Sequence, residues 1–246
     1  MYKYIWLIIS LCLGYATLGD VPASAKYNGN AHTHAAVNKP KPVSQSQRRL
    51  PKKLATDGSI NGHEYVDLGL PSGLKWATCN VGASSPSDFG DYFAWGEIAP
   101  KASYNESNCL TAQKNNLQLE SEGIINSSGI LTSPYDAAHT NWGATWRIPT
   151  KEEFEELIDK CNWTRSTDNG KTGYKITGHN GKTIFLPAGD VYRGTTLNSV
   201  GEFGCYWSAS VVYYIDAAYD MLFDTESSVV CPCYRYDGLS VRPVSE

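Results

Sequence analysis

The sequence predicts an α+β domain with antiparallel sheets, one or two helices and long loops. Sixteen Tyr, seven Trp and 22 Gly among 246 residues favour short strands joined by tight turns. Charged residues make up only 19% of the chain, which argues against long amphipathic helices. One segment, 150–161, carries a helical signature among many strand-like segments, the pattern of an α+β domain.

The first 25 residues have the pattern of a secretory signal peptide. Lys3 precedes an apolar run, and Ala23 and Ala25 supply small residues at the −3 and −1 positions of a cleavage site. The apolar run is too short to span a bilayer, which needs about 20 residues. We therefore expect a protein that is secreted or displayed at the cell surface, with no membrane insertion after signal cleavage.

Residues 26–59 predict a flexible linker. They are polar, rich in Asn, Ala, Lys, Pro and Ser, and show no apolar period that could build a core. The basic residues at 48, 49, 52 and 53 lie within this segment. With a net charge of −4, the chain has no bulk attraction to nucleic acid, and we expect no nucleic-acid partner.

The folded domain is expected to span residues 60–246. Residues 63–82 alternate apolar and polar side chains around Pro71-Ser72-Gly73, which predicts a hairpin. Residues 89–97 predict an aromatic strand or turn, and 101–141, rich in Asn, Ser and Gly, predict long loops.

One helix is predicted after Pro149. Thr150 and Glu153 have the spacing of a capping box, in which each side chain bonds the other residue's backbone N–H. Four residues then fall on one face at helical spacing: Phe154, Leu157, Ile158 and Cys161.

Strand patterns return after this helix. They are found at 173–178, 182–189, 204–210, 217–223 and 238–244. The Gly-Lys-Thr triplets at Gly170 and Gly181 lack the earlier glycine of a phosphate-binding loop, so we interpret both as hairpin turns.

No catalytic signature is found, and we expect no enzyme activity and no cofactor. His63-Glu64 lacks the second His of a metalloprotease helix, and no nucleophile elbow occurs. Most tryptophans lie in apolar or Gly-rich strand sequence and are predicted to be core. Besides Cys12 the chain has six cysteines, an even number that permits disulfides after export, while close Cys or His pairs at zinc-finger spacing are absent.

Several ordered motifs resemble one family. They are "VDLGLPSGLKWATCNVGASSPSDFGDYFAWGE", "AAHTNWGATWRIPTKEEFEELIDKCNW", "GYKITGHNGKTIFLPAG", "YWSAS" and "GLSVRPV". From about Gly62 to Val244 the chain resembles the Fibrobacter succinogenes major paralogous domain of secreted Bacteroidetes proteins. The resemblance implies a C-type-lectin-like fold, with chain ends meeting in a small sheet and long loops carrying a binding face. It also suggests a Cys79–Cys161 disulfide.

The family also carries variable regions of diversity-generating retroelements, and the C-terminus resembles one. Adenine-directed diversification of Asn codons never yields Lys, Glu, Gln, Met or Trp. Residues 211–220 and 227–237 contain none of these five types. Buried strands also avoid charged residues, which is the alternative explanation.

The same windows are predicted to form a ligand-binding face. Both break strict alternation, so neither can hide all its apolar side chains, and tyrosine offers large contact area at low entropic cost. Arg235 could orient a ligand, whereas Arg242 is predicted to be structural. The expected ligand-binding residues are Val211, Val212, Tyr213, Tyr214, Ile215, Asp216, Tyr219, Asp220, Val229, Val230, Cys231, Cys233, Tyr234, Tyr236 and Asp237.

These observations predict an exported receptor or adhesin that binds a protein or glycan. The calcium-site motifs of sugar-binding C-type lectins are absent, so we expect no metal site. Two alternatives stay open. One is a structural surface or pilus subunit; the other is an enzyme like the formylglycine-generating enzymes, which share the fold and use a cysteine pair such as Cys231 and Cys233.

Overall fold

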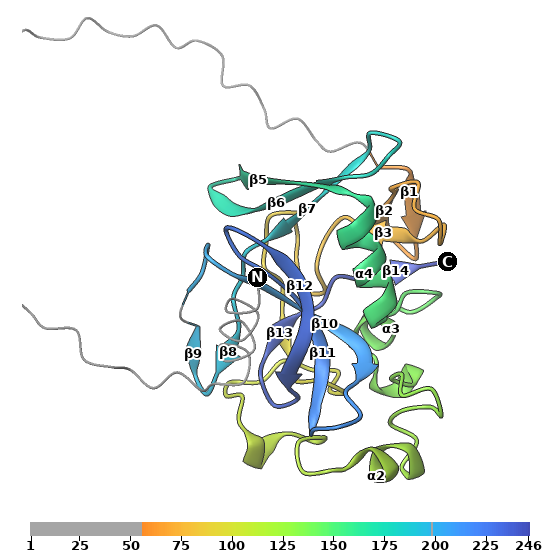
Figure 1. The fold of residues 1–246 in the computed structure, drawn as a ribbon, viewed down its shortest axis with the longest axis vertical. Helices are drawn as coiled ribbons and strands as arrows, with labels where there is room; N and C mark the ends of the chain where they lie inside the picture. The colour runs from red at the N-terminus through yellow and green to blue at the C-terminus, as the bar shows by residue number, and fades with distance from the viewer. Residues whose placement is uncertain (1–55, 198) are drawn as a thin grey trace, which may run out of the picture.

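The computed structural model describes residues 56–197 and 199–246 (Figure 1). The predicted signal peptide and residues 26–55 of the predicted linker lie outside this range. The described part is a mixed α+β structure with mostly antiparallel sheets and few helices, which confirms the predicted class. Its first strand, β1 (Gly58–Ile60), begins inside the expected linker. Asp57 accounts for this earlier start, since its backbone N–H bonds the Tyr65 carbonyl and its carboxylate pairs with Lys182.

The first and last strands of the described chain belong to one sheet. Its order is β1-β2-β3-β14, with β2 at His63–Asp67, β3 at Lys75–Ala77 and β14 at Val244–Ser245. β2 and β3 pair antiparallel around the Pro71-Ser72-Gly73 turn, which confirms the predicted hairpin. The two ends of the domain are thereby joined by backbone hydrogen bonds.

The central sheet has five strands in the order β12-β11-β10-β13-β4. Their bounds are Tyr92–Phe93 (β4), Gly204–Val211 (β10), Ala217–Phe223 (β11), Ser228–Tyr234 (β12) and Leu239–Ser240 (β13). β11 is antiparallel to both β10 and β12, so β10 and β12 run in the same direction and their C-terminal ends lie at the same end of the sheet.

A third sheet has the order β5-β6-β7 and a two-stranded ribbon joins β8 to β9. Their bounds are Asn162–Asp168 (β5), Lys171–Thr177 (β6), Thr183–Pro187 (β7), Tyr192–Arg193 (β8) and Thr196–Leu197 (β9). Gly170 and Gly181 lie in the β5–β6 and β6–β7 turns with φ of 78°. Both Gly-Lys-Thr triplets are therefore hairpin turns, as predicted.

The predicted helix is α4 (Lys151–Lys160), and its capping box between Thr150 and Glu153 is present. The stretch predicted as loops also holds short helices: η1 (Glu106–Asn108), α2 (Asn116–Ser121), η2 (Ser133–Tyr135) and α3 (Ala137–Trp142). With α2, α3 and α4, the expectation of one or two helices is too low for the described residues. α2 begins with an Asn115–Gln118 capping box, a signature that is visible in the sequence. Within the described part, no helix is both long and apolar enough to cross a bilayer.

Both faces of the central sheet are covered. One face joins a cluster with Trp95, Trp146 and Trp207, and the other joins a cluster with Phe154 of α4 and Ile176 of β6. All eight residues of β10 are buried as a result. Six tryptophans are predicted to be core, and five of them are buried: Trp76, Trp95, Trp142, Trp146 and Trp207. The prediction is wrong for Trp163, which is half-buried.

Candidate functional site

Many of the predicted binding residues lie at the end of the central sheet where β10 and β12 finish, but Val229 and Val230 lie at the start of β12, toward the opposite end. The β10–β11 loop, residues 212–216, follows the end of β10, and the β12–β13 turn, residues 235–238, follows the end of β12. Both lie at the end of the molecule that also carries α2 (Figure 1). The Asn116 side chain of α2 donates a hydrogen bond of 3.0 Å to the Val212 carbonyl, which fixes the loop beside the helix.

The tip of the β10–β11 loop is exposed. Tyr213 and Tyr214 have 66% and 72% of their surface accessible, and Ile215 has 37%. Asp216 is exposed as well, with 65% of its side chain accessible. The residues directly before and after these four, Val212 and Ala217, are buried, so the exposed tip is confined to residues 213–216.

Five further predicted residues are half-buried: Tyr219, Val229, Val230, Tyr234 and Tyr236. The Tyr234 and Tyr236 rings stack with centroids 5.0 Å apart and planes 10° apart. The Lys151 ammonium lies 5.3 Å from the centroid of the Tyr219 ring. Parts of these rings remain available for contact.

The other six predicted residues are buried, so they are not surface contacts. Val211, Val212, Asp220, Cys231, Cys233 and Asp237 are each at most 4% exposed. Alternation along β11 and β12 puts Asp220 and Cys231 opposite each other on a sheet face, and that face is covered by the cluster around Trp207. A ligand could reach these side chains only if the covering layer moved.

The buried residues form a polar group of their own. The Cys231 thiol donates to Asp220 Oδ1 at 3.3 Å, and the Cys233 thiol donates to Asp237 Oδ2 at 3.5 Å. Arg193 Nε also donates to Asp237 Oδ2, at 3.1 Å. Burial raises the pKa of Asp220 to about 7. No cluster of three or more His, Cys, Asp or Glu able to hold a metal ion occurs in 56–197 or 199–246.

Arg235 contacts the exposed loop from the buried side. Its side chain is fully buried, and its guanidinium donates at 2.8 Å to the carbonyls of both Thr111 and Lys114. The guanidinium also pairs with Asp216 at 3.3 Å and lies over the Trp95 ring. The expectation that Arg235 orients a ligand is therefore wrong, because the side chain is buried and its planar fork donates within the protein, linking Asp216 of the loop to residues 111–114.

Leu117 was not predicted as a site residue, yet it is 78% exposed on α2 next to Asn116. Because Asn116 binds the Val212 carbonyl, Leu117 lies on the helix that borders the exposed loop. The Asn115–Gln118 capping box marks this helix in the sequence, but not its position beside the loop. We call the whole surface the tyrosine face. It consists of Leu117, Tyr213, Tyr214, Ile215, Asp216, Tyr234 and Tyr236.

The predicted Cys79–Cys161 disulfide is absent. All six cysteines of the described part are outside disulfides. Cys161 packs against the cluster around Trp76 and Phe154, and burial raises the pKa of its thiol to about 11. The Cys79 sulfur instead lies 3.7 Å from the Thr78 hydroxyl. The two thiols thus lie in different surroundings, and Cys79 and Cys161 do not form the disulfide that the family resemblance suggests.

Comparison of the chain with protein-family models, with curated proteins and with solved structures finds no match.

Proposed function

We propose that this chain is an exported receptor or adhesin with a C-type-lectin-like fold, and that its tyrosine face binds a protein or glycan target. Two features support the fold: the first and last described strands share a sheet, and long irregular segments gather beyond the central sheet. The sequence motifs and the signal-like N-terminus support the family and the export.

A single observation carries the binding role. Tyr213 and Tyr214 are 66% and 72% exposed, while the residues on either side of the 213–216 tip are buried. Exposed aromatic rings contribute little to folding, but tyrosine is enriched among the residues that dominate binding energies. The Arg235–Asp216 ion pair and the hydrogen bond from Asn116 to the Val212 carbonyl order the loop beforehand, which lowers the entropy lost on binding.

The exposed tip also bears on sequence diversification. Burial explains why Lys, Glu and Gln are missing at positions such as Val212 and Cys231, but it does not explain their absence from 213–216. We propose that the loop tip is the part where diversification changes ligand contacts. A copy of the gene's 3′ end with adenines at these codons, beside a reverse-transcriptase gene, is the expected finding in the source DNA.

A binding comparison tests the proposed function. Wild-type protein and the Tyr213→Ala/Tyr214→Ala variant are applied to arrays of glycans and of candidate surface proteins. We expect the double variant to lose at least ten-fold in affinity for any specific ligand, because two large contact residues disappear. Val200→Ala is the matched control, since Val200 is 47% exposed but lies outside the tyrosine face.

The structural-subunit alternative gives a different result in the same experiment. If the wild-type chain binds nothing on either array but self-associates, and the double variant is monomeric, the tyrosine face is an assembly contact. Equal ligand binding by wild type and double variant would contradict the proposal.

A further inference from the structure

A pocket far from the tyrosine face lies between the third sheet and the β11–β12 turn. It has a volume of about 230 Å³ and is lined by Trp163, Tyr174, Glu226, Ser227 and Ser228. The tyrosine face is at the opposite end of β11, a seven-residue strand, so the two are roughly 20 Å apart. The pocket is therefore separate from the residues of the tyrosine face.

The aromatic side of the pocket is formed by Trp163 and Tyr174 on paired strands of the third sheet. Trp163 of β5 lies opposite Ile176 of β6, and Tyr174 is two residues before Ile176, so the two rings share a sheet face. Both rings pack on Phe223, with centroid distances of 5.9 and 5.2 Å. They are only half-buried there, so each keeps part of its surface at the pocket.

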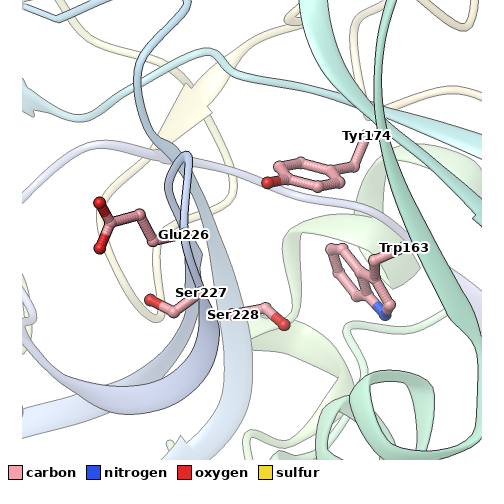
Figure 2. Close-up of a pocket in the computed structure, with 5 residues that line it drawn as sticks. All are labelled: Trp163, Tyr174, Glu226, Ser227 and Ser228. Atoms are coloured by element: carbon pink, nitrogen blue, oxygen red, sulfur yellow. The ribbon is translucent and has the colours of Figure 1, made fainter.

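The opposite side of the pocket is a fixed polar turn, as Figure 2 shows. Asp224 Oδ1 accepts the backbone N–H groups of Glu226 and Ser227 at 2.7 and 2.8 Å. The Tyr174 hydroxyl donates at 2.8 Å to the Asp224 carbonyl and ties the turn to the aromatic side. The pocket is thus formed before any ligand arrives, a condition that favours binding.

One polar group of the turn faces the aromatic side. The Ser228 hydroxyl points toward Trp163, whereas the Glu226 carboxylate points away from both rings (Figure 2). Among the described residues, none forms a hydrogen bond with the Ser228 hydroxyl. A serine hydroxyl both donates and accepts hydrogen bonds. The pocket therefore combines an aromatic wall with one hydroxyl group across from it.

We propose that this pocket is a second binding site, and that it takes one neutral saccharide ring. A sugar ring has a C–H face that packs on aromatic rings, and hydroxyl groups around its edge, one of which bonds to Ser228 across from the rings. The volume suits a single ring, because pockets for drug-sized ligands start at roughly 300 Å³.

An organic cation is the competing ligand class, and the ring geometry disfavours it. Aromatic cages for quaternary ammonium ligands place several aromatic faces around the charge, each within about 6 Å of it. Here the Trp163 and Tyr174 centroids are only 5.8 Å apart and their planes make 59°. The rings touch each other and form one wall, which leaves no space between them for a cation.

Ligand-observed NMR on the whole chain tests the proposal. The probes are free glucose, galactose, mannose, N-acetylglucosamine and N-acetylgalactosamine, with tetramethylammonium chloride as the cationic probe. We expect millimolar binding of at least one sugar, about a five-fold loss in Ser228→Ala from one missing hydrogen bond, and a loss of at least ten-fold in Trp163→Leu.

Two controls keep the result interpretable. Ser228→Ala changes a half-buried side chain, so it tests the pocket even if Trp163→Leu does not fold. Val200→Ala should leave sugar binding unchanged, because Val200 is 47% exposed and lies outside both the pocket and the tyrosine face. Three results would overturn the proposal: no sugar bound at tens of millimolar, sugar binding unaffected by all pocket variants, or binding of tetramethylammonium alone.

Discussion

Arg235 and Asp216 form an ion pair with Nη2 and Oδ1 3.3 Å apart, joining a fully buried guanidinium to a carboxylate that is 65% exposed. Such a pair is partly screened by water, so its own contribution to stability is small. The firmer attachment of Arg235 is to the carbonyls of Thr111 and Lys114, inside the protein. The strong bonds of Arg235 therefore join the β12–β13 turn to residues 111–114, and its contact with the exposed loop is the weaker one.

Replacing Arg235 with Met should destabilise the fold. Two buried carbonyls would lose a charged donor, and we expect the free energy of unfolding to fall by about 2–4 kcal/mol. Asp216→Asn should change it by less than about 1 kcal/mol, because Asp216 is mostly exposed. Urea unfolding of both variants measures this, and equal losses in the two would contradict the core-side attachment.

The buried carboxyl of Asp220 should make stability depend on pH. Its pKa is raised by burial to about 7 in the folded protein, against about 3.9 when unfolded. Between pH 4 and 7 the folded state therefore holds the proton more tightly, so this group lowers stability as pH rises, by at most about 1.4 kcal/mol per pH unit.

Asp220→Asn removes this titration. Near pH 3 to 4, the free energy of unfolding should change with pH in the same way in the variant and in the wild type. As pH rises to 8, the variant should become more stable relative to the wild type. Urea unfolding at several pH values between 4 and 8 gives the comparison. Parallel curves for the two proteins would show that Asp220 does not titrate in this window.

Gly129 makes room for Tyr213. It has φ of +74°, and a methyl group there would collide with the Tyr213 hydroxyl and a Val211 methyl. Gly129→Ala should destabilise by about 1–2 kcal/mol from backbone strain and should also displace Tyr213. Gly123 has φ of +71° with no atom within 4 Å of the added methyl, so Gly123→Ala reproduces the strain alone.

The two glycine variants separate stability from binding. Ligand binding at the tyrosine face should weaken in Gly129→Ala and persist in Gly123→Ala, at temperatures where both are folded. Equal binding by the two variants would mean that the position of Tyr213 is not decisive.

Arg242 should be among the most sensitive residues of the framework. It is fully buried and donates to the carbonyls of Ala77, Thr78 and Phe185 and to Asn80 Oδ1, at 2.8 to 3.0 Å. Arg242→Met should lower the free energy of unfolding by about 3–5 kcal/mol.

Arg165→Met is its matched control, because Arg165 is exposed and donates a single bond of 2.9 Å to the Gly201 carbonyl. We expect its effect to stay below about 1 kcal/mol. Thermal unfolding followed by circular dichroism compares the two. A mild effect of Arg242→Met would mean that its four bonds are replaced by others in the variant.

Local patterns in the sequence determined many of the elements. The Thr150–Glu153 capping box predicted α4, and the Gly170 and Gly181 turns followed from their flanking strands, because caps and tight turns depend on a few neighbouring residues. The helix α2 had an equally local signal at Asn115, which the Asn- and Ser-rich composition around it obscured.

Tertiary structure alone decided which residues of 211–237 face outward. Alternation along a strand says which side chains share a face, but not whether another layer covers that face. Asp220 and Cys231 look available in the sequence and are buried, because α4 and the segment before it cover both sides of the central sheet. The same long-range packing buries Arg235, exposes Leu117 and keeps Cys79 and Cys161 unpaired with each other, contacts that no stretch of neighbouring residues specifies.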